Sequence, residues 1–142
     1  MKKYTILALA FSNLSAHAGN AVIPYWTVTA SETACFSVSN ISSSDVGFKV
    51  TLFDQNGSKY SGALLYPVNI SALDQDTNLP AKSSASFCLQ KNSSNKFGHG
   101  FITTSESSDE GAKNFVVANG RQVYSVNSAH SALIPINGGL PF

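Results

Sequence analysis

Charged residues are scarce in this sequence, at 12 % of 142 positions, roughly half of what is usual for a soluble protein. The formal net charge is only +1, so the chain lacks the basic excess that attracts nucleic acid or an anionic membrane surface. Beyond the first eighteen residues, no apolar run approaches the ~20 residues of a membrane-spanning helix. We therefore expect no nucleic-acid partner and no membrane span.

Two common sequence motifs of catalysis and metal binding are also missing. The chain contains no GxSxG and no HExxH, the short patterns that mark a serine nucleophile and a zinc site. His99 and His130 are far apart, and His130 lies in a segment with the character of an exposed loop. The acidic clusters at 74–76 and 106–110 lack the ligand spacing of a calcium loop, and we interpret them as solvated loops. We expect a non-enzymatic protein without metal or cofactor.

The chain has only two cysteines, Cys35 and Cys88. Neither lies in a CxxC motif or beside a histidine, so a free reactive thiol or a metal pair is the less favoured alternative. One disulfide is the favoured interpretation, in keeping with an oxidising compartment. Closing a loop of about fifty residues is expected to stabilise the fold by roughly 4 kcal/mol.

The N-terminus has the order of a secretory signal peptide. Lys2 and Lys3 precede an apolar run at 4–11, and Ala16 and Ala18 supply the small residues that a signal peptidase reads. We therefore predict a cleaved signal peptide over residues 1–18 and one domain over residues 19–142. Cleavage leaves seven basic and eight acidic residues. The predicted location is the periplasm or the extracellular space.

The remaining sequence alternates between apolar and polar residues with a period of two, which is typical of half-buried strands. Turn signals such as Asn56-Gly57 separate the alternating segments. Residues 70–76 are the one place where we expect a helical turn, and Trp26 is expected in the core. Strands are expected at 22–29, 33–40, 46–54, 58–66, 83–90, 98–105, 114–118, 122–126 and 132–136.

Short strands with this spacing predict an all-β fold, a single two-sheet antiparallel β-sandwich with about seven to nine strands. An antiparallel pairing that sets Cys35 opposite Cys88 also sets Phe36 opposite Phe87, so that one face of the pair is apolar. The disulfide is therefore predicted between neighbouring strands on the outer face of one sheet. In antibody domains, by contrast, the bridge joins the two sheets.

His99 stands in the segment Phe97-Gly98-His99-Gly100-Phe101. Alternate residues of a strand point to the same side, so His99 shares a face with Phe97 and Phe101. We expect a buried, hydrogen-bonded imidazole there. The alternative is a ligand site, because glycines allow close approach to the backbone.

Aromatic residues are the remaining candidates for a binding surface. Phe53 shares parity with Thr51, so we expect its side chain to point outward, while Tyr60 and Tyr66 lie near strand edges. Exposed aromatics suit a protein or a glycan partner. For Phe53 and Tyr60 two interpretations remain open, contact with a partner or packing under the 66–79 loop. The candidate ligand or partner contacts are Phe53, Tyr60, Tyr66 and His99.

Three segments, 32–40, 46–54 and 79–84, give a strand, a turn, a second strand and a Pro-Ala lead into a third. This pattern resembles small exported bacterial β-sandwich modules of the immunoglobulin-like and sensory-rhodopsin-transducer types, and the resemblance implies a fold but no functional residue. The first hypothesis is a non-enzymatic exported protein that acts by surface contacts, as an envelope, adhesion or assembly component. The alternatives are a carbohydrate- or small-ligand-binding module and a surface-fibre subunit.

Overall fold

The structure is a computed structural model that describes residues 19–105, 116–124 and 131–142. The signal peptide expected over residues 1–18 lies outside these ranges, as do His130 and the acidic cluster at 106–110.

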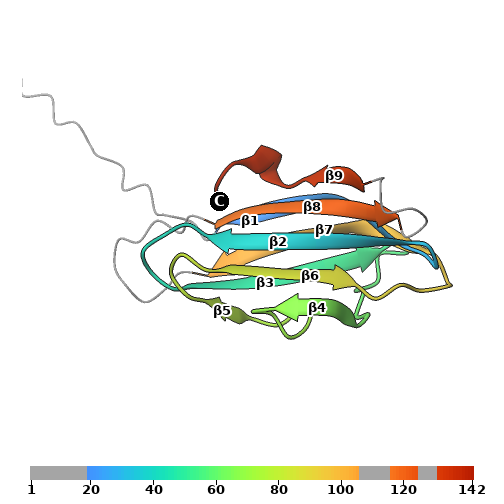
Figure 1. Ribbon diagram of the computed structural model, residues 1–142, viewed down its shortest axis with the longest axis horizontal. Helices are drawn as coiled ribbons and strands as arrows, with labels where there is room; N and C mark the ends of the chain where they lie inside the picture. The colour runs from blue at the N-terminus through green and yellow to red at the C-terminus, as the bar shows by residue number, and fades with distance from the viewer. Residues whose placement is uncertain (1–18, 106–115, 125–130) are drawn as a thin grey trace, which may run out of the picture.

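The described residues form two antiparallel sheets that stack face to face (Figure 1). The four-stranded sheet has the order β1-β7-β3-β5 and the five-stranded sheet the order β4-β6-β2-β8-β9. The expected all-β, two-sheet antiparallel sandwich is therefore confirmed. Its elements are β1 (Asn20–Val28), β2 (Glu32–Asn40), β3 (Val46–Asp54), β4 (Leu64–Val68), β5 (Thr77–Leu79), β6 (Ser84–Leu89), β7 (Lys96–Ser105), β8 (Val116–Tyr124), β9 (Ser131–Pro135) and the short 3-10 helix η1 (Asn137–Gly139).

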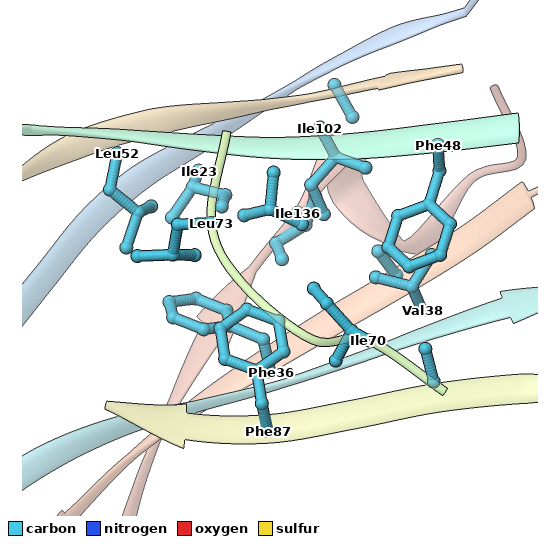
Figure 2. Close-up of a cluster of buried hydrophobic side chains, with 14 of the residues drawn as sticks. Ile23, Phe36, Val38, Phe48, Leu52, Ile70, Leu73, Phe87, Ile102 and Ile136 are labelled. Atoms are coloured by element: carbon cyan, nitrogen blue, oxygen red, sulfur yellow. The ribbon is translucent and has the colours of Figure 1, made fainter. Parts of the chain in front are cut away.

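Alternation along each strand builds the core between the two sheets. Every second residue of β3 from Val46 to Asp54 is buried, and the residues between them are only partly covered. From the five-stranded sheet, the rings of Phe36 and Phe87 meet with centroids 5.4 Å apart. Figure 2 shows these rings facing the aliphatic side chains of the opposite sheet. Burial of this apolar surface is the main force that holds the sheets together.

The segment 69–76 closes one side of the core without forming a helix. Ile70 and Leu73 are buried and point between the sheets (Figure 2). Asp74 has a positive φ of 57° and donates its backbone N–H to the carbonyl oxygen of Val50, at 2.8 Å. The helical turn expected here is wrong, because the segment bends to insert two apolar side chains and to bond β3.

Two further expectations about strands are wrong for reasons of packing. Residues 58–60 turn back along β3, where the Tyr60 amide bonds the Leu52 carbonyl at 2.9 Å. The chain then crosses to the other sheet, and β4 begins only at Leu64. The described residues of the strands expected at 114–118 and 122–126 belong to one strand, β8; residues 114–115 and 125–126 lie outside the described ranges. Gly120 does not end a strand; a Cβ there would lie 2.9 Å from the Phe36 ring, so the glycine makes room for that ring.

Candidate functional site

The four candidate contact residues lie in three different places. Phe53 and His99 are neighbours on the outer side of the four-stranded sheet. Tyr60 lies at the edge of the core, and Tyr66 projects from β4 in the five-stranded sheet. Two separate surfaces therefore need to be considered.

The first surface, which we call the aromatic face, consists of Phe53, His99, Phe101 and Val22. Phe53 in β3 stands opposite His99 in β7, and their rings stack with centroids 5.6 Å apart and planes 18° apart. Phe101 meets both rings edge-on, at 5.8 Å from His99 and 6.2 Å from Phe53. Val22 pairs with Phe101 and is half exposed. The result is a patch of exposed and partly exposed aromatic and aliphatic side chains across three strands.

His99 is exposed, so its expected burial is wrong. The shared parity with Phe101 holds, but that side of β7 is the outer one, and Ile102 occupies the inner side. The neighbouring Gly98 is needed by the fold rather than by a ligand, since a Cβ at this position would lie 1.9 Å from the carbonyl oxygen of Phe53. The close backbone approach is that of β3 itself.

Trp26 is fully buried, as expected, and lies behind the aromatic face. Its indole Nε1 donates a hydrogen bond to the carbonyl oxygen of His99, at 2.9 Å. Tyr60 packs on the indole with ring centroids 4.7 Å apart, and burial raises the pKa of the Tyr60 phenol. Of the two residues whose role the sequence leaves open, Tyr60 therefore packs against the core, whereas Phe53 faces outward.

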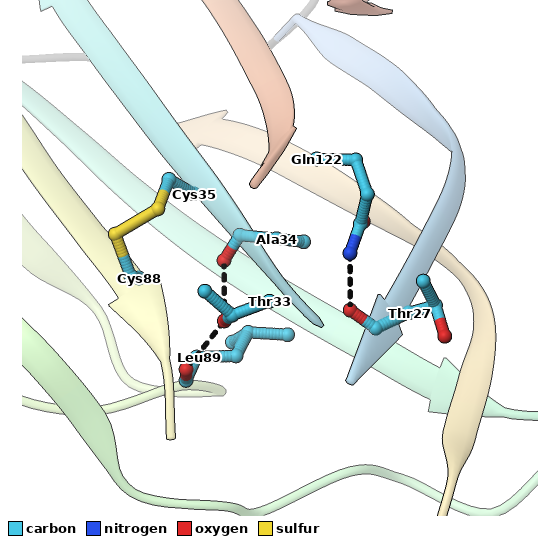
Figure 3. Close-up of a disulfide and its surroundings, with 7 residues drawn as sticks. All are labelled: Thr27, Thr33, Ala34, Cys35, Cys88, Leu89 and Gln122. Atoms are coloured by element: carbon cyan, nitrogen blue, oxygen red, sulfur yellow. Dashed lines mark hydrogen bonds between the residues drawn. A yellow bond between two sulfur atoms is a disulfide. The ribbon is translucent and has the colours of Figure 1, made fainter. Parts of the chain in front are cut away.

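The second surface surrounds the disulfide. Cys35 in β2 bonds Cys88 in β6, and the two residues stand directly opposite each other (Figure 3). Phe36 faces Phe87 in the same ladder, which is the predicted register. The cysteines alternate with these buried rings, so the predicted disulfide on the outer face of one sheet is confirmed.

A groove of about 470 Å³ lies over this disulfide. Its floor is made by the Cys35–Cys88 bridge together with Ser37 and Ser86. Tyr66 of β4 forms one side, and Asn119 and Arg121 of β8 form the other. We call this surface the disulfide groove; its volume lies in the range typical of small-ligand sites.

Tyr66 is the most exposed large apolar side chain of the described residues, at 82 %. Its backbone φ is +51°, a left-handed conformation that costs a non-glycine residue roughly 1–2 kcal/mol. It lies where the pairing of β4 with β6 is irregular, between Leu65 and Val68. Strained residues of this kind are often found at functional sites.

Arg121 is the only charged residue among the described residues that line the disulfide groove. In residues 19–105, 116–124 and 131–142, the ion pairs are Lys49–Asp76, Lys59–Asp74 and Lys96–Asp54, and none of them includes Arg121. The guanidinium is exposed, with its donors available to an anionic group.

The acidic residues of the 74–76 segment pair with lysines. Asp74 accepts hydrogen bonds from Lys59 and from Thr51, and Asp76 lies 3.6 Å from the Lys49 ammonium. The ammonium of Lys59 and the hydroxyl of Thr51 hold the pKa of Asp74 below its usual value. Within the part of the chain that the structure describes, no three His, Cys, Asp or Glu side chains converge on a common point. No helix in that part is long and apolar enough to cross a membrane.

The β-sandwich architecture by itself does not assign a function, because many unrelated proteins share it. The aromatic face and the disulfide groove are therefore the features from which function can be inferred. No protein-family model, no curated protein and no solved structure matches this chain.

Proposed function

We propose that this chain is an exported, non-enzymatic binding protein of the cell envelope that contacts another protein through the aromatic face. Export is supported by the signal-like order of residues 1–18. It is also supported by the Cys35–Cys88 disulfide, since such bonds persist in oxidising compartments.

The observation that carries the proposal is the stacked arrangement of Phe53, His99 and Phe101 on the outside of a sheet. Interface cores are enriched in aromatic residues and poor in charge, and a contiguous exposed apolar patch commonly marks an interaction site. The outward residues next to this patch on β3 and β7 are Thr51, Lys49 and Thr103. An apolar centre with a polar rim is the usual anatomy of a protein–protein interface.

The geometry of the rings favours a protein over a sugar at this surface. A sugar stacks on the open face of an aromatic ring, but Phe53 and His99 each turn one face toward the other. Phe101 completes the cluster by meeting both rings at steep angles, 78° and 89°. The patch therefore offers packed rings as a continuous apolar surface, which suits the side chains of a partner protein.

Site-specific photo-crosslinking in the cell that produces the protein tests this proposal. A benzophenone amino acid replaces Phe101 in one variant and, in the control, Gln90, an exposed residue directly after β6 of the other sheet. We expect one major crosslinked protein from position 101, none from position 90, and loss of the crosslink when Phe53→Ser is added. Crosslinks of equal yield from both positions, or none from position 101, would contradict the proposal.

The same experiment separates the fibre hypothesis from the binding-protein proposal. A subunit that assembles by strand exchange crosslinks to copies of itself, which gives a ladder of multiples of the chain mass. A single band that contains a different protein supports the proposed function, whereas a ladder replaces it with the fibre subunit.

A further inference from the structure

We propose that the disulfide groove is a second binding site, specific for an acidic oligosaccharide. In this site the Tyr66 ring stacks on a sugar ring, and Arg121 holds the sugar's carboxylate. Ser37, Ser86 and Asn119 then bond its hydroxyl groups. This site lies on the five-stranded sheet, whereas the aromatic face lies on the four-stranded sheet. The two proposals can therefore be tested independently of each other.

The shape of the groove follows from the order of strands in the sheet. In one cross-strand row, Leu65, Cys88, Cys35, Arg121 and Leu133 are successive neighbours from β4 to β9. The middle strands carry the compact disulfide, and the outer strands carry longer side chains.

The next row repeats the pattern with Val68, Ser86, Ser37, Asn119 and Pro135. Small outward residues on β6 and β2 thus form a floor between taller flanks. Neighbouring strands are roughly 4.8 Å apart, so the three spacings from β4 to β8 leave a trough about 14 Å wide between backbones. A chain of sugar rings fits a trough of this width along the strand direction.

The floor favours a sugar over an extended peptide. A peptide binds a sheet chiefly by adding a strand at a free edge, through backbone hydrogen bonds. The strands under the groove, β6 and β2, are paired on both sides, so their backbone groups are already used. Recognition must come from side chains. Besides the disulfide, Phe36 and Phe87, the residues that line the groove supply hydroxyls, an amide, a guanidinium and a phenol ring. These groups match a ligand rich in hydroxyl groups.

Tyr66 provides the stacking surface that the aromatic face lacks. It has no ring neighbour among the aromatic contacts of the described residues, and most of its side chain is open to solvent. Its left-handed backbone holds the residue at the rim of the groove. An exposed, pre-positioned ring loses little conformational freedom when a ligand stacks on it.

Arg121 determines the charge of the ligand. Of the described residues that line the groove, it is the one that carries a charge, and none of them has a carboxylate. A guanidinium binds a planar carboxylate through two parallel hydrogen bonds, a geometry that neutral sugars cannot satisfy. A uronic-acid sugar carries that carboxylate directly on its ring, within the reach of a ligand seated over the Cys35–Cys88 floor.

A calorimetric titration of the oxidised protein with matched saccharides tests the site. The probes are a tetrasaccharide of galacturonic acid and its carboxyl-reduced form, which has the same ring stereochemistry without the charge. We expect the acidic probe to bind at least tenfold more tightly than the reduced probe. The difference should shrink as salt is added, because the guanidinium is exposed and its attraction is screened.

Four variants locate the binding. Arg121→Gln should erase the preference for the acidic probe, and Tyr66→Ala should weaken both probes at least tenfold. Lys59→Gln is the matched charge control and Tyr25→Ala the matched tyrosine control. Lys59 lies beside β3 and Tyr25 in β1, both on the four-stranded sheet, so neither change should alter the affinity. Thermal melts of all four variants verify that each is folded.

Several outcomes overturn the proposal. One is the absence of binding at 10 mM for galacturonate, hyaluronan and sialylated probes alike. Another is acidic-probe binding that survives both Arg121→Gln and Tyr66→Ala. A hexaglutamate peptide that binds with the same dependence on these residues, while the saccharides do not, reassigns the groove to acidic peptides.

Discussion

Gln122 of β8 reaches across the core to Thr27 of β1, donating a hydrogen bond from Nε2 to the Thr27 carbonyl oxygen at 3.1 Å (Figure 3). This contact joins the two sheets. Gln122 is only 3 % exposed, and within the described structure its Oε1 has no hydrogen-bond partner. A buried acceptor left in this state costs roughly 1–3 kcal/mol. Gln122 therefore tolerates no added negative charge.

The variant Gln122→Glu should make the stability strongly dependent on pH. Burial without donors raises the pKa of the new carboxyl above its unfolded value of roughly 4.3. Below pH 4 the neutral acid still donates to the Thr27 carbonyl, so the variant should be about as stable as the parent protein at the same pH. Stability is lost as the pH rises toward the folded pKa, by about 1.4 kcal/mol for each pH unit between the unfolded and the folded pKa. Urea unfolding between pH 3.5 and 8 measures this loss.

Gln122→Met is the matched control for this prediction. This change removes both the unpaired acceptor Oε1 and the donor Nε2 of Gln122, with little change in side-chain volume. The stability should therefore stay within roughly 2 kcal/mol of the parent protein, with the same pH profile. A Gln122→Glu profile that parallels the parent at every pH would show that the site is not sealed from water.

Loss of the disulfide should lower the stability without disrupting the fold. The bridge joins Cys35 and Cys88, 53 positions apart, and closing such a loop removes unfolded-state entropy worth about 4 kcal/mol. Serine at both positions fits the outer face beside Ser37 and Ser86, so little strain is added to the folded state. The Cys35→Ser, Cys88→Ser protein should fold and melt at a lower temperature. An unchanged melting temperature would contradict the entropic effect.

Asn40 at the end of β2 is a hydrogen-bonding hub between two turns. Its Nδ2 donates to the carbonyl oxygens of Ser44, Leu79 and Pro80, at 2.7, 3.0 and 3.1 Å. Its Oδ1 accepts from the amide and the hydroxyl of Ser42, at 2.9 and 2.7 Å. The side chain thus ties the loop after β2 to the turn after β5.

Replacing Asn40 with alanine should destabilise the protein by about 3 kcal/mol, because at least one buried partner is left unsatisfied and several bonds are lost. Asn78→Ala is the control: Asn78 is exposed, its side chain bonds the Asp45 carboxylate at 3.2 Å, and its loss should change the stability by no more than about 0.5 kcal/mol. Urea unfolding compares the two. An equal loss of stability in the two variants would mean that the buried hydrogen bonds of Asn40 contribute no more than the exposed bond of Asn78.

Alternation along the chain was sufficient to predict β2 and β3, and the register around the disulfide, because those features depend on local side-chain parity. It failed where packing between distant residues decides the structure. Asn119-Gly120 has the composition of a turn, yet Gly120 continues β8 since the Phe36 ring occupies the space of its side chain. The three-residue β5 is too short to leave a periodic signal.

The candidate surfaces show the same limit. Parity placed His99 and Phe101 on one side of a strand, but which side is buried depends on the partner sheet, and the aromatic residues turned out to be on the outside. The disulfide groove depends on the strand order that brings β4 and β8 to opposite flanks of β6 and β2. Tyr66 was singled out as an exposed aromatic, whereas Arg121 was missed. One sequence signal could have indicated the groove. The outward positions of two neighbouring strands are small, at Cys35 and Ser37 of β2 and at Ser86 of β6, and small side chains leave room above the sheet.

Asp54 at the end of β3 organises the turn that follows. One carboxylate oxygen accepts the amides of Asn56 and Ser58, at 2.9 and 3.1 Å, and the other accepts from the Lys96 ammonium at 3.0 Å. The Lys96 contact, followed by the Asn56 amide, lowers the pKa of Asp54 below its ordinary value. A lowered folded-state pKa contributes stability above the unfolded pKa of roughly 3.9, and that stability is lost as the pH falls through the folded value.

Acid unfolding should therefore respond to both partners of this ion pair. Lys96→Met removes the main cause of the lowered pKa, so less of the stability depends on the ionised carboxylate. This variant should be less stable than the parent protein near neutral pH, and it should lose less stability than the parent as the pH falls below about 4. Asp54→Asn removes the titrating group while an amide oxygen still accepts the turn amides, so its stability should be flatter between about pH 2 and 4. Urea unfolding at half-unit steps resolves these slopes. Parallel curves for all three proteins would show that the protonation of Asp54 does not contribute to acid unfolding.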